Sequence, residues 1–258
     1  MKIIHLAVMA LSVAYFSGCA PLPYNHLEQD AHAFINETDV VLAVPQEEIY
    51  GDIESSNLTA AAGGGLLFAL IDAMVESSRA SNAEEAVTPV RDKLLDYDYA
   101  QVLAEEINNQ IQTIEWLSAD DVQLERSTND TWVTDKVSSS SASAILLMTA
   151  RYHLTPNLDS VETMVSLRMY PNSNSLEEYK EKQDVDKDVI SGTDNIYRND
   201  LTASTVLFSG STKDANRLSL ESDDGTKLKD ALDKNAKKIA RMIYQDLNID
   251  GASDSVDK

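Results

Sequence analysis

Cysteine is almost absent from this chain of 258 residues, in which Cys19 is the only one. A single thiol cannot form an internal disulfide, so the fold must be held together by its core without covalent cross-links. Histidine is scarce too, and after His5 only His26, His32 and His153 remain. The interval between His26 and His32 does not place two imidazoles on one helical face, as a zinc-binding H-E-x-x-H does. The sequence therefore predicts no metal site there.

Catalytic motifs are missing as well. No G-x-S-x-G occurs, and His153 is the only candidate base in a segment that we expect to be ordered. It lies beside Tyr152 in an expected strand, where we expect a structural role for it. Carboxylates are too numerous for any pair to stand out as glycosidase residues. The sequence thus predicts a protein that is not an enzyme and binds no cofactor.

One acidic segment resembles a calcium loop in part. Asp184, Asp186 and Asp188 have the spacing of the first three ligands of an EF-hand. The sixth position of such a loop requires glycine and the twelfth a bidentate glutamate, but Val189 and Asn195 stand there. Neither of these two positions has the residue that an EF-hand requires. We therefore interpret the segment as a solvated acidic loop and predict no metal.

Basic residues are few. The chain has 21 Lys and Arg against 43 Asp and Glu, a net charge of -22. Phosphate backbones and anionic lipid head groups need clustered basic residues, so nucleic acid is excluded as an expected partner. The best basic cluster falls in the last amphipathic segment, and we interpret it as the solvated face of a helix: Lys227, Lys229, Lys234, Lys237, Lys238 and Arg241.

The glycine-containing run "AAAGGGLLFALI", from Ala60 to Ile71, is apolar but short. Twelve helical residues rise about 18 Å, against a hydrocarbon core of about 30 Å, so the run cannot span a membrane. It also lacks the lysine and the spacing of a phosphate-binding loop. Small residues recur at every fourth position on one helical face, which favours close packing: Ala61, Gly65, Ala69 and Ala73. Three partners for this face remain open: the domain's own sheet, another protein or a second copy, and the membrane surface.

The N-terminus has the organisation of a signal peptide. A basic residue, Lys2, precedes an apolar stretch from Ile3 to Phe16, and small residues lead to Cys19. The sequence "FSGC" resembles the lipobox of bacterial lipoproteins, with Phe16 where that family usually has leucine. The alternative is an ordinary thiol after a conventional secretory signal.

The resemblance implies that Cys19 is lipidated, for example with palmitate, and becomes the mature N-terminus. More than one acyl chain gives stable anchoring. In the family's sorting rule an aspartate after the cysteine retains the protein at the inner membrane; Ala20 stands here, which implies the outer membrane with the domain in the periplasm. Residues 1–18 are then the signal peptide and residues 19–38 the lipidated cysteine and tether.

The rest of the chain alternates between strand and helix periodicity. Strands are expected at "DVVLAVP", "VQLER", "AILLMTARYHL", "VETMVSLRMY" and "LTASTVLFSG". Tyr99, Val102, Leu103, Ile107, Ile111 and Ile114 form one apolar stripe behind an Asp98 cap, and "TKLKDALDKNAKKIARMIYQDL" forms a closing amphipathic helix. The short connection "TPNLDS" predicts antiparallel pairing of the two strands that it joins.

This order of elements predicts an α+β fold, a mostly antiparallel sheet of four to five strands covered by helices. We expect a single domain over residues 39–248 and an acidic, disordered tail over residues 249–258. The order resembles the small α/β domains of TolB and of CsgG-like envelope lipoproteins. The segment "AAAGGGLLFALIDAMVESSRASNAEEAVTPVRDKLLDYD" is similar to uncharacterised proteobacterial envelope proteins.

Two hypotheses for function follow. The first is a non-enzymatic, lipid-anchored structural or assembly component of a periplasmic or outer-membrane complex, with an envelope protein or a second copy as partner. The alternative is a periplasmic ligand-binding module or a cell-wall hydrolase.

Overall fold

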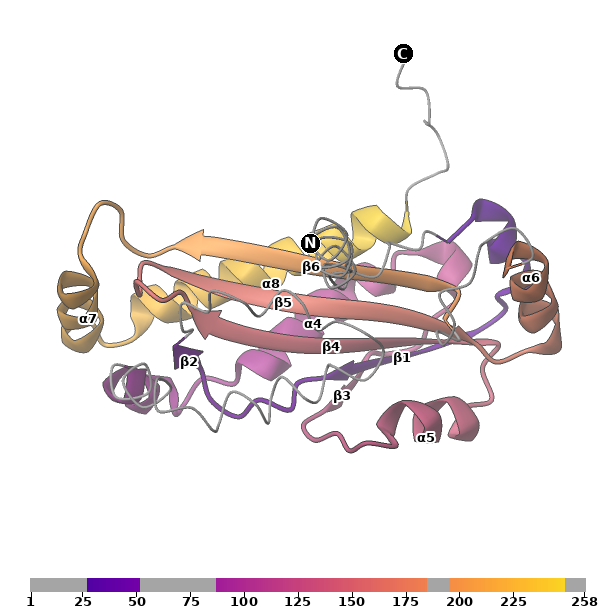
Figure 1. Cartoon of the computed structure of the whole chain (residues 1–258), viewed down its shortest axis with the longest axis horizontal. Coiled ribbons are helices and arrows are strands. Elements are labelled where there is room, and N and C mark those ends of the chain that lie inside the picture. Colours follow the sequence, from indigo (N-terminus) through magenta and orange to yellow (C-terminus); the bar gives the residue numbers. More distant parts are fainter. Residues whose placement is uncertain (1–26, 52–86, 185–194, 249–258) are drawn as a thin grey trace, which may run out of the picture. The chain divides into compact units, whose positions relative to one another are not determined.

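The computed structural model of the chain describes residues 27–51, 87–184 and 195–248, which all belong to one compact unit (Figure 1). Cys19 and the small-residue face of Ala61, Gly65, Ala69 and Ala73 lie outside the described residues. The elements are η1 (Gln29–Phe34), β1 (Thr38–Ala43), β2 (Tyr50–Gly51), η3 (Asp92–Leu94), α4 (Tyr99–Ile111), η4 (Glu115–Leu117), β3 (Gln123–Glu125), α5 (Trp132–Ser139), β4 (Ala144–Leu154), β5 (Ser160–Pro171), α6 (Asn174–Asp184), β6 (Tyr197–Val206), α7 (Lys213–Ser222) and α8 (Thr226–Leu247).

The predicted α+β class is confirmed. One open sheet has the strand order β3-β1-β4-β5-β6, and β2 pairs with the far end of β4. Its long central pairs, β4 with β5 and β5 with β6, are antiparallel, as the short connection after β4 predicted. The sheet has six strands rather than four or five because the very short β2 and β3 also join it.

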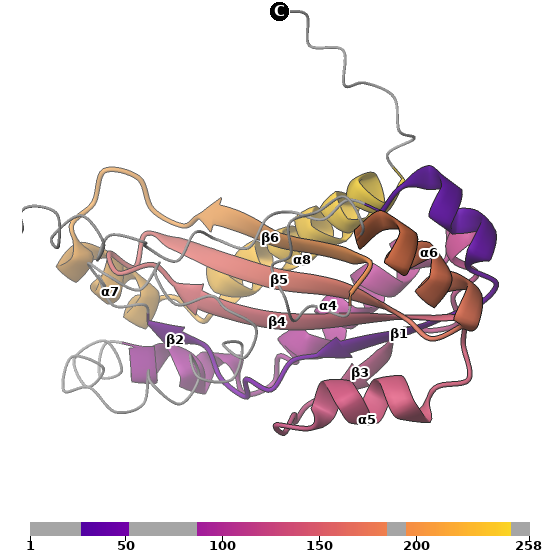
Figure 2. The same ribbon diagram turned by 45° about the vertical axis from the view of Figure 1, so that its right-hand side comes forward.

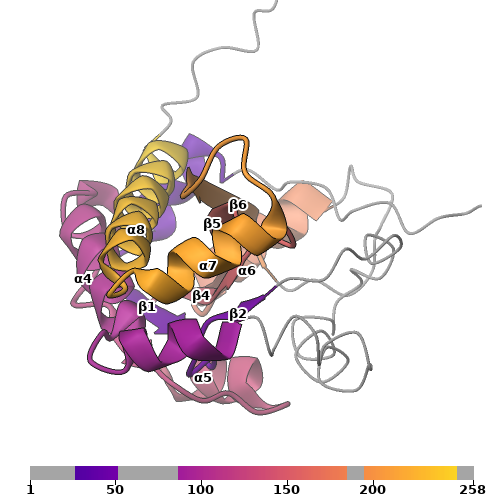
Figure 3. The ribbon, with the colours of Figure 1, turned by 90° about the vertical axis from the view of Figure 1, so that its left-hand side faces the viewer.

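The first half of the sheet is parallel, which the sequence did not indicate. β1 runs parallel to β3 on one side and to β4 on the other. The chain passes from β1 through α4 to β3, and from β3 through α5 to β4. Because β3 and β4 flank β1 on opposite sides, crossovers of the same hand place α4 and α5 on opposite faces of the sheet. Figure 3 shows this arrangement, with α4 and α8 together on one face.

The main core lies between the sheet and the pair α4 and α8. In β5, buried residues alternate with half-exposed ones, so one face of the strand packs on the helices. The predicted apolar stripe of α8 is buried: Leu228, Leu232, Ile239, Ile243 and Leu247. In α4, Tyr99, Leu103, Ile107 and Ile111 are buried in the same way. Each such aliphatic side chain stabilises the fold by about 1.5–3 kcal/mol.

Two polar contacts inside this core fix the register of the helices on the sheet. Asn235 of α8 is fully buried; its Nδ2 donates to the carbonyl of Val161 at 2.9 Å and its Oδ1 accepts from Thr205 Oγ1 at 2.6 Å. Tyr99 Oη and Thr163 Oγ1 are hydrogen-bonded at 2.7 Å. A buried amide without partners would cost about 1–3 kcal/mol, so α8 cannot slide along the sheet without that cost.

Side chains of the chain itself occupy part of the free edge of β6, the last strand in the sheet order. Lys238 Nζ donates to the carbonyl of Ser204 at 2.6 Å, and the backbone N–H of Asp200 donates to Asn199 Oδ1 at 2.8 Å. Groups that are already bonded cannot pair with a strand of another molecule. This edge is therefore poorly suited to strand addition.

A lysine side chain caps the C-terminal end of α7. Lys93 Nζ donates to the carbonyls of Leu220, Glu221 and Asp223 at the end of α7, where a cation stabilises unpaired helix carbonyls. Gly225, which follows, has φ of 90°, and a Cβ there would lie 3.0 Å from Lys93 Cβ. Only glycine accommodates both the backbone conformation and this contact.

The packed core extends N-terminally of Asp39. Leu27, Ala31 and Ile35 are buried with the main core. η1 packs beside α6, where Tyr179 Oη donates to Asp30 Oδ1 at 2.7 Å (Figure 2). The sequence did not predict α5, α6 or α7, because their apolar stripes are short. In the described part of the chain, no helix combines the length and the hydropathy needed to cross a bilayer.

The chain leaves the sheet between β1 and β2. Both strands pair with β4, but residues 44–49 lie opposite only Ala150–Tyr152. The side-chain amide of Gln46 supplies the missing backbone pairing. Its Oε1 accepts from the N–H of Tyr152 at 2.9 Å, and its Nε2 donates to the carbonyls of Tyr152 at 2.6 Å and Glu48 at 2.7 Å. The side chain of Gln46 thus makes the hydrogen bonds to β4 that a strand residue would make, while the main chain bulges away from the sheet.

We predict that Gln46→Ala lowers the free energy of unfolding by about 2 kcal/mol, because both backbone groups of Tyr152 lose their partner in a partly buried position. Urea denaturation of the full chain measures this. Gln101→Ala is the matched control, since the Gln101 amide bonds only Glu105 on the exposed surface of α4 and its loss costs about 0.5 kcal/mol or less. Equal midpoints for the two variants would contradict the assigned role of Gln46.

Candidate functional site: a tyrosine-lined pocket

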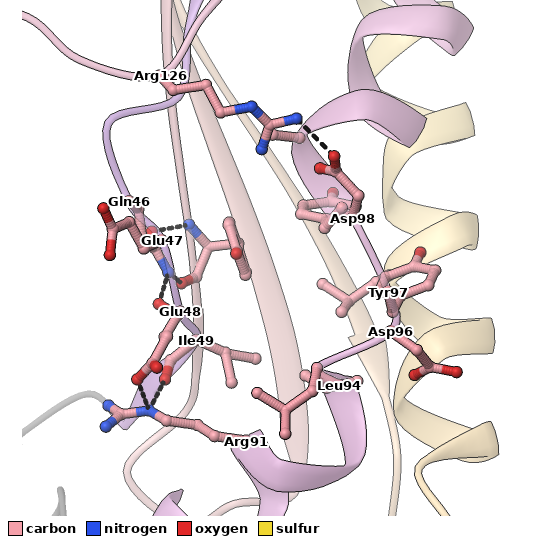
Figure 4. A pocket seen from close by; sticks show the side chains of 15 residues that line it. Gln46, Glu47, Glu48, Ile49, Arg91, Leu94, Asp96, Tyr97, Asp98 and Arg126 are labelled. Atoms are coloured by element: carbon pink, nitrogen blue, oxygen red, sulfur yellow. Dashed lines mark hydrogen bonds and ion pairs between the residues drawn. The ribbon is translucent and has the colours of Figure 1, made fainter.

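The bulge of residues 44–49 forms one wall of a pocket with a volume of about 420 Å³ (Figure 4). The pocket lies where β1 and β3 end and α4 begins, so the carboxyl ends of two parallel strands face a helix N-terminus. Open sheets commonly bind ligands at this position, and the volume lies within the usual range for small-molecule sites. Residues 91–100 form the opposite wall.

Ion pairs cross the pocket at both ends (Figure 4). Arg126, which follows β3, reaches Asp98 at the start of α4, with Nη2 2.5 Å from Oδ2. At the other end Arg91 Nε lies 3.3 Å from Glu48 Oε2 and donates to the carbonyl of Ile49 at 2.7 Å. These pairs join the bulge, and the residue that follows β3, to the helical wall.

The carboxylates of this wall are stabilised in their charged form. Asp98 caps α4, as predicted, by accepting from the N–H of Gln101 at 3.1 Å. The hydrogen bond from Arg126 holds the pKa of Asp98 below its usual value. The hydrogen bond from Lys229, at 2.6 Å, likewise lowers the pKa of Asp96. Both groups are therefore anions at neutral pH.

Three tyrosines line the inner side of the pocket. The rings of Tyr97 and Tyr99 are stacked at 6.4 Å between centroids, and Tyr99 meets Tyr152 edge to face at 4.7 Å. Burial raises the pKa of all three phenols, that of Tyr152 to about 12. For Tyr97, a hydrogen bond to Asp233 Oδ1 at 2.5 Å acts in the same direction. The phenols stay protonated at neutral pH and act as neutral hydrogen-bonding groups.

The groups in the pocket are suited to binding. Among the described residues that line it there is no serine, threonine, cysteine or histidine. A glycosidase acid requires a carboxyl group with a raised pKa, whereas the pKa values of Asp96 and Asp98 are lowered. Arginine forks, amides and aromatic rings are the groups with which proteins orient a bound ligand.

Neither of the two described histidines lies in the pocket. His153 is buried in β4, with Nε2 3.6 Å from Glu162 Oε2 and its ring stacked on Tyr50 at 5.4 Å. His32 of η1 stacks on Trp116 at 3.9 Å. His26 lies outside the described residues. The structure thus places both described imidazoles in packing contacts.

The acidic segment of the sequence is only partly described. Asp184 ends α6, while Asp186, Asp188 and Val189 lie outside the described residues. Within the described ranges, no three His, Cys, Asp or Glu side chains are grouped so that they could hold a metal ion.

The basic cluster lies on α8, as expected for the polar side of the closing helix. Part of it makes internal contacts: Lys229 pairs with Asp96, Lys238 bonds the edge of β6, and Lys227 Nζ lies 4.2 Å from the ring centroid of Phe208. Lys234, Lys237 and Arg241 are exposed.

Sequence reasoning did not identify the pocket. Its members come from five separate parts of the chain, represented by Gln46, Asp98, Arg126, Tyr152 and Leu232. No spacing rule connects them. The available signals were the proline and glutamine that end the β1 run and the pair Tyr97 and Tyr99 at the start of α4, and neither points to a ligand by itself.

The tyrosines predict a loss of stability at alkaline pH. The native protein keeps the phenol protons that the unfolded chain releases at about pH 10. The stability that the buried phenols contribute is therefore fully present below that pH. It is lost as the pH rises toward 12, with a slope of about 1.4 kcal/mol per pH unit for each phenol. Tyr99→Phe should reduce this slope in urea denaturation series, while Tyr170→Phe on the other face of β5 serves as the control. Equal slopes for the two variants would refute the assignment.

No protein-family model matches this chain, and no curated protein matches its sequence. Three solved structures are similar to it in part. A protein from Caulobacter crescentus CB15, provisionally classed as a lipoprotein, is 13% identical over 57% of this chain and 78% of its own, with a TM-score of 0.26. A DUF330 protein from Xanthomonas campestris is 8% identical over 87% and 89%, with a TM-score of 0.31. The PelC dodecamer from Paraburkholderia phytofirmans is 12% identical over 81% and 92%, with a TM-score of 0.24. Similarity of this extent carries no argument about function.

Proposed function

We propose that this chain is a lipid-anchored protein of the bacterial envelope. The observation that carries the proposal is the N-terminal sequence, in which Lys2, the apolar stretch to Phe16 and "SGC" precede the only cysteine of the chain. Lipidation of Cys19 gives the anchor, and Ala20 directs the protein to the outer membrane. The acidic domain that follows lies in the periplasm.

Within this setting the domain acts as a non-enzymatic structural or assembly component that contacts another envelope protein or a second copy. The pocket supports a non-enzymatic role because most of its charges are held in ion pairs and its phenols are protonated at neutral pH. The bonded groups along the edge of β6 favour contacts through helices and loops rather than strand addition.

The second candidate function is a periplasmic ligand-binding module. The pocket favours it, because its volume of about 420 Å³ lies within the range of small-molecule sites. The two functions are compatible, since an assembly component can respond to a ligand. The lowered pKa values of Asp96 and Asp98 do not favour a cell-wall hydrolase, since a glycosidase acid requires a raised pKa.

Substitution of the cysteine tests the anchor. Cys19→Ser should move the protein from the outer-membrane fraction to the soluble periplasm or leave its signal uncleaved, and should remove the acyl mass from the N-terminal peptide. Fractionation and mass spectrometry measure both. Phe16→Leu, which restores the usual residue, should keep wild-type behaviour, and Ala20→Asp should shift the protein to the inner membrane. A Cys19→Ser protein with the same fractionation and N-terminal mass as wild type would refute the anchor.

In-cell crosslinking followed by mass spectrometry tests the assembly role. We expect a specific envelope protein, or a covalent homodimer, that Cys19→Ser reduces, because the anchor concentrates the domain at the membrane. A periplasmic protein of similar acidity and abundance is the control for random encounters. If both proteins yield the same crosslinks, the assembly role is wrong.

A further inference from the structure

The hydroxyl of Tyr152 is a polar group of the pocket that the contacts among the described residues do not explain. The residue is only 6% exposed, and its side chain lines the pocket. The hydroxyls of Tyr97 and Tyr99 are bonded to Asp233 and Thr163, but no described residue is a hydrogen-bond partner of the Tyr152 hydroxyl. This hydroxyl is not one of the fully buried polar atoms that lack a partner, so it reaches the open space of the pocket, where a bound ligand can form a hydrogen bond with it.

We propose that this pocket binds a small organic cation, of the class of primary amines and diamines. The proposal rests on the ligand-binding candidate above and assigns its ligand. The ammonium group donates to the Tyr152 hydroxyl, and its aliphatic part lies against the partly exposed ring of Tyr97. Aromatic rings attract cations within about 6 Å of the centroid, so this ring favours a cationic ligand.

The charge of the lining selects a cation. Four carboxylates line the pocket, those of Glu47, Glu48, Asp96 and Asp98, against two guanidinium groups, those of Arg91 and Arg126. The guanidinium groups face Glu48 and Asp98, and Lys229 pairs with Asp96 from outside the pocket. Glu47 is exposed and has no ion pair or hydrogen bond to any described residue. The uncompensated charge at the pocket is therefore negative.

The same wall disfavours an anionic ligand. The N-terminus of α4 would attract an anion, but the Asp98 carboxylate already occupies it through the N–H of Gln101. A second anion would lie beside Asp98 and Glu48. A neutral ligand would not compensate the negative charge of Glu47. The net charge of -22 also raises the local concentration of cations around the whole chain.

Calorimetric titration of the full chain in a nonionic detergent tests the proposal, at about 0.15 M salt to screen general attraction to the acidic surface. The probes are putrescine, the neutral butanediol and the anionic succinate. We expect putrescine to bind with a stoichiometry of one, and butanediol and succinate to give no saturable heat. Succinate binding, or no saturable heat from millimolar putrescine, would overturn the proposal.

Four variants locate the binding. Tyr152→Phe removes only the hydroxyl and should weaken putrescine binding about 3- to 10-fold. Glu47→Gln should weaken it about 2- to 5-fold, and Arg126→Gln should strengthen it because Asp98 becomes available. Glu178→Gln removes one exposed carboxylate from α6, away from the pocket, and should change nothing.

Thermal unfolding checks that each variant retains the native fold. Equal weakening by Glu47→Gln and Glu178→Gln would show that putrescine binds the acidic surface in general and would overturn the assigned site. Unchanged putrescine binding by the Tyr152→Phe variant would also overturn the assigned site. A negative binding result would not affect the proposal of a lipid anchor, because the anchor is tested separately by the fractionation of the Cys19→Ser protein.

Discussion

The candidate site depends on the interruption of strand pairing between β1 and β2. Both strands hydrogen-bond to β4, but six residues of the bulge lie opposite three of that strand. A sheet tolerates such an excursion only if the backbone groups left open find other partners, and the Gln46 amide provides them for Tyr152. The bulge then stands away from the sheet, and the space behind it becomes the pocket.

The two ends of the pocket are joined to elements that the core holds rigidly. α4 and α8 are packed on one face of the sheet, and Asn235 and the Tyr99–Thr163 pair fix how the helices lie along it. Asp98 is therefore held where Arg126 reaches it, and Leu232 of α8 also lines the pocket. The ring of Tyr99 belongs to the core and to the pocket at once, so the stability of the domain and the geometry of the site are coupled.

The sequence predicts the regular elements well where periodicity is long. The stripes of α4 and α8 and the alternation in β5 were recognisable because each element buries one face and exposes the other. Short elements escape this reasoning: β2 has two residues, and α7 buries only Asn216 and Leu220. The parallel pairing of β1 was also hidden, because a buried apolar run looks the same in either direction.

The sequence alone was enough to identify the excess of negative charge, the single cysteine and the α+β class, and to predict the compartment from the N-terminal pattern. These depend on local order and composition, which are read along the chain. Only the tertiary structure decided where a site could form, because Gln46, Asp98, Arg126 and Tyr152 are brought together by the paths of β1, α4, β3 and β4. The hydroxyl of Tyr152 illustrates the difference: its residue type is visible in the sequence, but its lack of a described partner follows from the packing around it.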